Sequence, residues 1–274
     1  MKKNVLLGFF IILQLWAFAQ DEPKKEFTKA IEDNSYYIEE AYNQEDRVVQ
    51  HINNATYKTT DPKFFSYSFT QEWPFFSQKH QVSYTVGLLY LESNKITGIT
   101  DVMINYRYQL TGHDAFVTLA PRVSLIIPTG DVKKEMGAGA WGVQFNLPMS
   151  KRLSNSFAMH ANIGYTLLPN VEKSALDGTL YKTNDWSSSF GGSLIWLTSS
   201  KFNVMFEAIH FYYGYKDIDN KSITGNNTIL SPGLRFAIDI KNLQIVPGIA
   251  VPFTLENGSS DMGIFFYLSF EHPF

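Results

Sequence analysis

Apolar and polar residues alternate with a period of two along most of the chain after residue 46. In one clear stretch, Val82, Tyr84, Val86, Leu88 and Tyr90 share one face, and Gln81, Ser83, Thr85 and Gly87 lie on the other. Successive side chains of a β-strand point to opposite faces, so this period indicates strands rather than helices. About twelve such stretches follow one another, each close to the ~9–11 residues that a tilted strand needs to cross a bilayer.

The connectors between these stretches also alternate, between short and long. The short ones are 111–114, 151–156, 198–201 and 241–242, and the long ones are 128–138, 170–182, 216–227 and 254–261. Transmembrane barrels have short turns on the periplasmic side and longer loops outside. The connectors and the even number of strands therefore predict an all-β fold, a closed antiparallel transmembrane β-barrel over residues 47–274.

The same alternation would suit a soluble β-protein whose apolar face points inward. Two groups of residues favour the inverted arrangement of a membrane barrel. The polar face carries charges in or near mid-strand, which predict a wet lumen lined by Arg107, Arg122, Glu207, Arg235, Asp239 and Glu271. The apolar face carries tryptophans near strand ends, which predict the aromatic girdles of a membrane barrel at Trp73, Trp141, Trp186 and Trp196.

Three prolines oppose this assignment. Pro121, Pro232 and Pro247 lie within predicted strands, where the missing N–H breaks a ladder hydrogen bond. They fit a barrel if they occupy bulges or if the strand limits predicted here are wrong.

The N-terminus has the pattern of a secretory signal peptide. Lys2 and Lys3 precede an apolar stretch over residues 5–18 that only Gln14 breaks, and Ala17 and Ala19 form a small-x-small cleavage site. The apolar run is short of the ~20 residues of a membrane-spanning anchor. The sequence predicts a signal peptide over residues 1–19 and an exported protein.

Residues 20–46 are polar and charged, with apolar residues at a loose helical spacing. Three interpretations stay open for this segment: a short periplasmic helix, a plug inside the lumen, or disorder.

The sequence offers little for catalysis or for cofactors. The chain has no cysteine, and its net charge of -3 gives no reason to expect a nucleic-acid partner. The glycine-rich run at 137–140 lacks the Lys and Ser/Thr of a phosphate loop, and the six histidines lack metal-ligand spacing. We expect no cofactor, no metal and no catalytic residue. The alternative is a lipid hydrolase that uses Ser187–Ser189 with His160 or His210.

Several motifs resemble a known family. The chain ends in Phe274, which is similar to the terminal aromatic residue that barrel-insertion machinery reads. The stretches 38–45, 48–52, 69–74 and 80–84 resemble the outer-membrane family described as "putative MetA-pathway of phenol degradation", in its Bacteroidetes-type branch. The resemblance implies an outer-membrane transporter with a loose link to aromatic compounds, and it carries no agreed catalytic residues.

These observations predict a passive channel in the bacterial outer membrane for small solutes, aromatic or hydrophobic ones among them. Its expected partners are the lipid bilayer, the barrel-insertion machinery and an unidentified small solute. A non-conducting binding or structural barrel that uses loops 170–182 and 216–227 is the alternative, and a lipid-modifying enzyme is a more remote one.

Overall fold

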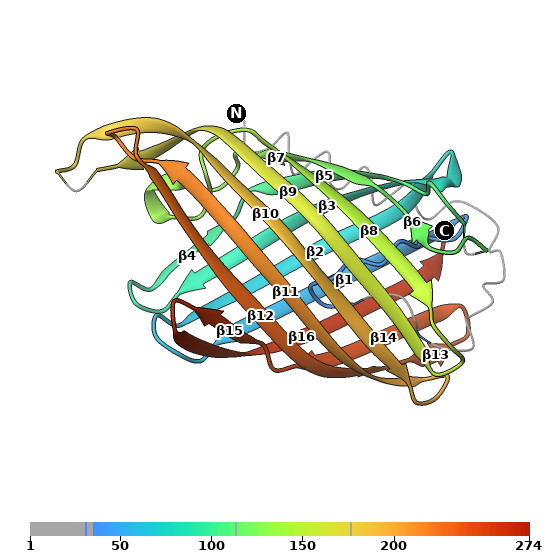
Figure 1. The fold of residues 1–274 in the computed structure, drawn as a ribbon. Coiled ribbons are helices and arrows are strands. Elements are labelled where there is room, and N and C mark those ends of the chain that lie inside the picture. The colour runs from blue at the N-terminus through green and yellow to red at the C-terminus, as the bar shows by residue number, and fades with distance from the viewer. Residues whose placement is uncertain (1–30, 32–34, 113, 176) are drawn as a thin grey trace.

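The computed structural model describes residues 31, 35–112, 114–175 and 177–274. The signal peptide predicted over residues 1–19 lies outside the described residues. Sixteen antiparallel segments form one sheet that closes on itself (Figure 1). They are β1 (Val48–Lys58), β2 (Phe64–Phe75), β3 (Ser77–Leu91), β4 (Ile96–Ile99), β5 (Val102–Tyr108), β6 (Thr118–Leu119), β7 (Arg122–Ile127), β8 (Gly142–Arg152), β9 (Phe157–Ser174), β10 (Leu180–Leu197), β11 (Phe202–Lys216), β12 (Ser222–Phe236), β13 (Ile238–Ile240), β14 (Leu243–Ala250), β15 (Phe253–Glu256) and β16 (Ser259–Pro273).

The barrel closes where its first and last strands meet. β1 pairs with β16 over its whole length, from Val48 opposite Pro273 to Lys58 opposite Gly263. Four of the barrel's strands consist of two consecutive segments each: β4 with β5, β6 with β7, β12 with β13, and β14 with β15. The sixteen segments therefore form a closed barrel of twelve antiparallel strands, which confirms the predicted fold.

The three prolines lie either between two strand segments or where a strand changes its partner. Pro121 separates β6 from β7. Pro232 lies where β12 changes its partner from β15 to β14, and Pro247 lies between the pairing of β14 with β12 and its pairing with β13. Their carbonyls still take part, since Pro121 accepts from the Tyr108 N–H at 3.0 Å. The predicted strand limit at Pro121 was therefore wrong, whereas Pro232 and Pro247 lie within β12 and β14, at changes of strand partner.

The interior is polar and the exterior is apolar. Gln50, Gln81, His160, Glu207 and Arg235 are all at most 2% exposed, whereas large hydrophobic side chains in mid-strand face outward. Phe145, Ile163 and Phe190 are examples, with exposed fractions of 54%, 58% and 60%. A soluble protein would bury such residues. The inverted arrangement predicted from the charged and tryptophan positions is therefore confirmed, and the apolar belt suits a lipid bilayer.

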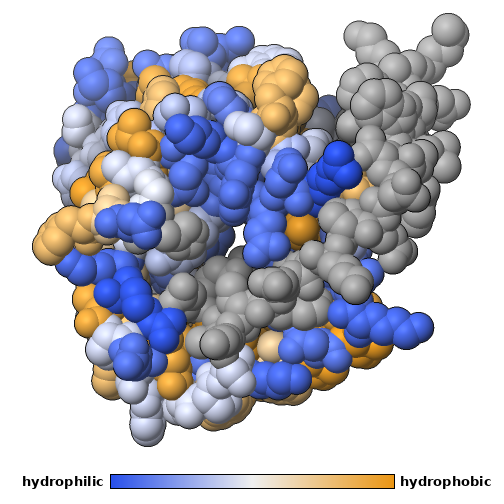
Figure 2. Space-filling view, turned by 90° about the vertical axis from the view of Figure 1, so that its right-hand side faces the viewer, coloured by the Kyte–Doolittle hydropathy of each residue, from blue (hydrophilic) through white to orange (hydrophobic). Residues whose placement is uncertain are grey.

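The two ends of the barrel differ. At one end, called here the hairpin end, β9 and β10 project beyond the other strands (Figure 1). At the opposite, short-turn end, hydrophilic side chains surround the mouth (Figure 2). By the general asymmetry of outer-membrane barrels, short turns face the periplasm.

Three of the predicted outer loops are wrong in extent. Most of 170–182, 216–227 and 254–261 continues as strand, and only residues 175–179, 217–221 and 257–258 connect the hairpins. The connector between β7 and β8 contains a short 3-10 helix, η2 (Val132–Lys134). In the part of the chain that the structure describes, no helix is long and apolar enough to cross a membrane.

Candidate functional site

The described residues between 31 and 46, called here the lumen segment, lie inside the barrel. Residues 35–46 contain no helix. Their backbone N–H groups donate to side chains of the barrel wall: Tyr36 and Tyr37 to Glu207 at 2.8 Å each, Glu39 to Asn162 at 2.7 Å, Ala41 to Ser150 at 2.7 Å, Asn43 to Gln109 at 2.9 Å, and Gln44 to Gln81 at 2.7 Å. The acceptors come from β11, β9, β8 and β3 and from the end of β5. The segment therefore crosses the lumen from wall to wall. Residues 20–30 and 32–34 lie outside the described residues.

The backbone carbonyls of the lumen segment are bound in the same way. The Arg107 guanidinium donates to the carbonyls of Glu40 at 3.1 Å and Tyr42 at 2.6 Å, and the Gln109 amide donates to the carbonyl of Ala41 at 2.7 Å. Leaving a buried backbone group without a partner costs about 1–3 kcal/mol. Among the described residues, no strand pairs with the segment through its backbone. Polar side chains of the barrel wall therefore supply the hydrogen bonds that a neighbouring strand would supply in a sheet.

Aromatic rings fix the other half of the segment. The Tyr36 ring lies 5.1 Å from Phe265 and 5.9 Å from Tyr267, and the Tyr37 ring lies 5.2 Å from Phe265. The Tyr36 hydroxyl also donates to the carbonyl of Leu234 at 2.6 Å. Phe265 and Tyr267 are bulky residues on the inner face of β16, where the alternation predicts small or polar ones. Their packing against the lumen segment explains this exception.

Arg107 is a centre of the polar contacts. It is 3% exposed, and its Nε donates to the side chain of Asn43 at 2.9 Å. Its guanidinium also lies 3.5 Å from the carboxylate of Glu40 and 3.9 Å from that of Glu72. Because it holds two carbonyls and two side chains of the lumen segment, Arg107 links that segment to β5.

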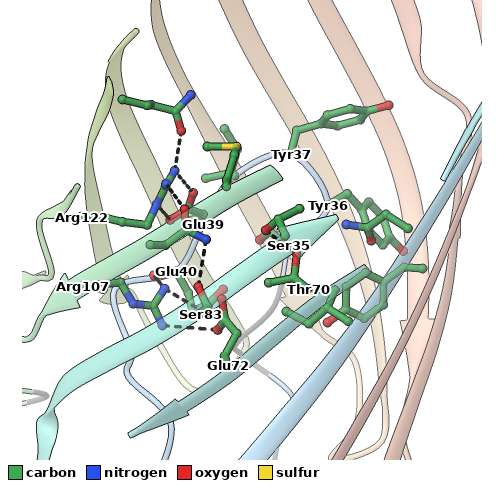
Figure 3. Close-up of a pocket in the computed structure, with 18 residues that line it drawn as sticks. Ser35, Tyr36, Tyr37, Glu39, Glu40, Thr70, Glu72, Ser83, Arg107 and Arg122 are labelled. Atoms are coloured by element: carbon green, nitrogen blue, oxygen red, sulfur yellow. Dashed lines mark hydrogen bonds and ion pairs between the residues drawn. The ribbon is translucent and has the colours of Figure 1, made fainter. Parts of the chain in front are cut away.

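Arg122 forms a two-pronged ion pair with the lumen segment (Figure 3). Its Nε and Nη2 donate to the two carboxylate oxygens of Glu39 at 2.9 and 2.6 Å. The same guanidinium donates to Gln144 at 2.8 Å and to Asn105 at 3.2 Å. Burial alone would raise the pKa of Glu39, but the charge and hydrogen bonds of Arg122, aided by Arg107, outweigh it and hold this pKa below its ordinary value.

The other charged residues singled out in the sequence fall into two groups. Glu207 binds the segment as described, and Arg235 donates to the carbonyl of Ile31 at 3.2 Å. Glu271 accepts from Gln50 at 2.7 Å, and Gln50 in turn accepts from Gln44 of the segment at 2.7 Å. Asp239 instead lies at the short-turn end, 3.3 Å from Lys201.

Sequence reasoning missed the neutral residues of the site. Asn162, Gln109, Gln81 and Ser150 bind the segment's backbone directly. Asn162 and Gln109 each contact both an N–H and a carbonyl. Their positions on or beside the polar faces of strands were the available signal, but a neutral amide there is equally typical of a plain lumen wall.

A cavity of about 300 Å³ lies between the lumen segment and the barrel wall. Ile38, Met103 and Tyr267 line it. Glu39 and Arg122 line it too, and Figure 3 shows these two side chains meeting. The lining mixes charged, amide and hydroxyl groups with apolar surface from tyrosine, methionine and isoleucine side chains. A small solute inside the barrel could occupy this space.

The structure does not assemble the hydrolase considered from the sequence. His160 lies opposite Ser193 and contacts the Ser150 hydroxyl at 2.7 Å, while Ser187–Ser189 lie opposite residues 164–166. His210 contacts Thr228 at 2.9 Å and lies opposite Phe190 on the outer face. Within the described residues, no group of three or more histidine or acidic side chains could hold a metal ion.

The four tryptophans and the last residue take the following positions. Trp141 and Trp196 are 56% and 51% exposed, Trp73 packs on Tyr84, and Trp186 packs on Tyr212. The N–H of Phe274 donates to the carbonyl of Arg47 at 3.0 Å, so the chain ends beside the start of β1.

Solved structures with the same fold are outer-membrane channels and porins. The COG4313 outer membrane channel from Pseudomonas putida F1 matches with a TM-score of 0.64 and 12% identity, over 85% of this chain and 98% of that one. The NanC porin matches with a TM-score of 0.55 and 13% identity, over 80% and 98% of the two chains. At such low identity these matches show the fold alone. The apolar belt of the barrel, rather than these matches, is what suits it to an outer membrane.

At the level of sequence, no curated protein matches the chain significantly. The comparisons distinguish no branch of a family, so the Bacteroidetes-type branch stays a prediction. One family matches residues 32–267, which is most of the chain and includes residues 35–46 of the lumen segment. The chain therefore belongs to the family described as "Putative MetA-pathway of phenol degradation", and it is a β-barrel of the outer membrane.

Proposed function

We propose that this barrel is a passive channel for small hydrophobic or aromatic solutes and that the lumen segment controls passage. The cavity of about 300 Å³ beside the segment carries this proposal, because it offers a solute-sized space inside a closed barrel. The family description, with its link to phenol degradation, supports the choice of aromatic solutes.

The contacts of the segment suggest how passage would work. Those to Asn162, Ser150, Gln109 and Gln81 are hydrogen bonds to neutral side chains, each with a net contribution of only about 0.5–1.5 kcal/mol. Part of the segment can therefore detach while the rest stays bound. A solute would enter from the hairpin end, occupy the cavity and pass when a neighbouring stretch of the segment moves aside.

The charged residues of the lumen would determine which solutes pass. We assign this role to Arg107, Arg122, Glu207, Arg235 and Glu271, with Asp239 at the exit. Pore size and lining charge together determine selectivity in such channels. No step of this function requires catalysis.

We further propose the cellular route that the sequence implies. Residues 1–19 would direct export, residues 20–46 would form the plug, and residues 47–274 would form the barrel. Phe274 would be read by the barrel-insertion machinery, and the four tryptophans would lie at the two membrane interfaces.

An engineered disulfide tests whether the lumen segment controls passage. The chain has no native cysteine, so the double substitution Ala41→Cys with Ser150→Cys gives a single defined pair. These positions are in contact, since the Ala41 N–H donates to the Ser150 hydroxyl at 2.7 Å. We expect solute entry into liposomes to fall on oxidation and to recover on reduction. The two single-cysteine variants are the matched controls.

Single-channel conductance supplies a second test. We expect the refolded mature protein to conduct in a planar bilayer and a variant without residues 21–46 to conduct more. If neither form conducts or passes solute, although both migrate on gels as folded barrels, the channel is excluded. A non-conducting binding barrel would then be favoured, because the segment contacts the wall on several sides of the lumen.

A further inference from the structure

The two arginines that line the cavity hold the lumen segment in different ways. Arg107 binds backbone carbonyls of the segment, so its release would undock that part of the segment. Arg122 binds the segment through the Glu39 carboxylate (Figure 3). The backbone of Glu39 is held separately, by the side chain of Asn162. The Glu39 side chain can therefore swing away from Arg122 while the segment stays in place.

The Glu39 carboxylate is also the accessible half of this ion pair. Its side chain is 34% exposed and lines the cavity, whereas that of Arg122 is 11% exposed. If the carboxylate left, Arg122 would keep only the neutral acceptors Asn105, Gln144 and Ser124. A buried cation without a counter-ion is strongly destabilising. Only another anion with two oxygens at carboxylate spacing can accept the same two parallel hydrogen bonds from the Arg122 guanidinium.

The charge of the cavity restricts the incoming group to a single negative charge. The charged side chains that line the cavity are Glu39, Glu40, Glu72, Arg107 and Arg122. A monocarboxylate that takes the place of the Glu39 carboxylate leaves the balance around the two guanidiniums unchanged. A dianion would add an uncompensated negative charge beside Glu40 and Glu72.

The size and the apolar lining restrict the rest of the molecule. A volume of about 300 Å³ is at the small end of ligand pockets. Ile52, Met103 and Tyr37 supply apolar surface next to the charged groups. A compact molecule with one ring and one carboxylate fits both conditions.

We propose that Arg122 is a carboxylate-binding site for small one-ring aromatic monocarboxylates and that Glu39 is its resident competitor. This inference rests on the proposed function, in that the solute must reach the cavity. To the neutral solutes of the proposed channel it adds aromatic monocarboxylates, and it assigns their selection to Arg122.

Calorimetric titration of the refolded mature protein at pH 7, with benzoate and its neutral analogue benzamide, tests the site. Glu39→Gln should bind benzoate at least tenfold more tightly than the wild type, because the competing charge is gone. Arg122→Gln should bind it at least tenfold more weakly. Arg122→Lys keeps the charge but loses the fork, and we expect intermediate weakening. Benzamide affinity should be the same in all four proteins.

Matched controls are available away from the cavity. Glu172→Gln in the exposed part of β9 and Arg152→Gln at the short-turn end make the same chemical changes, and both should bind benzoate like the wild type. If Arg122→Gln does not migrate as a folded barrel, Arg122→Lys carries the test. The inference is overturned if benzoate binds the Arg122 variants as tightly as it binds the wild type. It is also overturned if Glu39→Gln does not raise the affinity for benzoate, or if it raises the affinity for benzamide by the same factor.

The rate at which neutral benzyl alcohol enters liposomes, compared with protein-free liposomes, separates this inference from the proposed function. If the protein speeds benzyl alcohol entry but the affinity for benzoate does not depend on Arg122, the carboxylate site is wrong and the channel stands. If benzoate binds through Arg122 but the protein speeds the entry of neither solute, the site stands and the channel is wrong.

Discussion

The side chain of Asn162 binds both polar groups of Glu39's backbone. Its Oδ1 accepts from the Glu39 N–H at 2.7 Å, and its Nδ2 donates to the Glu39 carbonyl at 2.7 Å. A neighbouring β-strand would offer this same pair of groups. Asn162 thus lets an irregular stretch of chain be buried in the lumen with its backbone satisfied, at the point where the segment passes β9.

Replacing Asn162 by leucine should loosen the lumen segment. The change leaves two backbone groups unsatisfied, and even one such group costs about 1–3 kcal/mol. We expect at least a tenfold increase in the open fraction, measured as single-channel open probability, and faster protease cleavage within residues 35–46. Asn155→Leu, in the exposed turn before β9, is the matched control. An open probability equal to that of the control would show that Asn162 does not hold the segment.

The barrel itself was predictable from sequence because its signal is local. Along each strand the outward residue meets lipid and the next one meets the polar lumen, so a period of two appears directly in the sequence. Phe145 and Ile163 outside, with Asn162 and Glu207 inside, follow this rule. The loops were predicted less well, because hairpins beyond the bilayer have water on both faces. In 170–182 and 216–227 the alternation therefore fades although the strands continue.

The path of the lumen segment was not predictable in the same way. Its loose helical spacing arises from residues such as Tyr37, Ile38 and Tyr42. In the structure these side chains pack inside the lumen and do not form one face of a helix. The residues that bind its backbone, Asn162 and Gln109, are far apart in sequence. Only the register of the barrel brings them around one segment. The charged positions Arg107 and Glu207 were found because a charge on a strand's inner face is rare enough to stand out.

The ion pair of Glu39 with Arg122 predicts a specific pH dependence. The pKa of Glu39 in the folded protein lies below its ordinary value of 4.5. The carboxylate therefore stabilises the docked segment fully above that ordinary value, and this stabilisation is lost as the pH falls through the folded pKa. We expect the conductance difference between wild type and Glu39→Gln to stay constant from pH 7 to 5 and to shrink below pH 4.5. A difference that already shrinks between pH 7 and 5 would contradict the lowered pKa.

The proposed aromatic girdles predict the membrane depth of Trp141 and Trp196. Variants that keep one tryptophan each, with the others changed to phenylalanine, would be placed in bilayers of brominated lipids. We expect both tryptophans to be quenched most by bromine near the headgroups. Phe190→Trp is the reference for the middle of the barrel, since position 190 is 60% exposed, and bromine deep in the acyl chains should quench it most. Equal depth profiles for positions 141 and 190 would remove Trp141 from the girdle.

Gly248 makes room for the ring of Tyr36. A Cβ at this position would lie 2.7 Å from the Tyr36 hydroxyl and 3.0 Å from its Cε1. Gly248 is opposite Arg235 on one side and Tyr267 on the other, so it lies in the wall directly beneath the ring. The ring cannot move freely to relieve a clash, because Phe265 packs against it and Leu234 binds its hydroxyl.

Gly248→Val should therefore displace Tyr36 and release this end of the lumen segment, although the segment's own sequence is unchanged. We expect higher conductance, with gel migration still that of a folded barrel. Gly192→Val on β10 is the matched control, because the nearest atom to a Cβ there is a carbonyl oxygen at 3.3 Å. If the effect acts through the ring, Gly248→Val should add little once Tyr36→Ala is present. Additive effects of the two substitutions would mean that the valine disturbs the barrel wall itself.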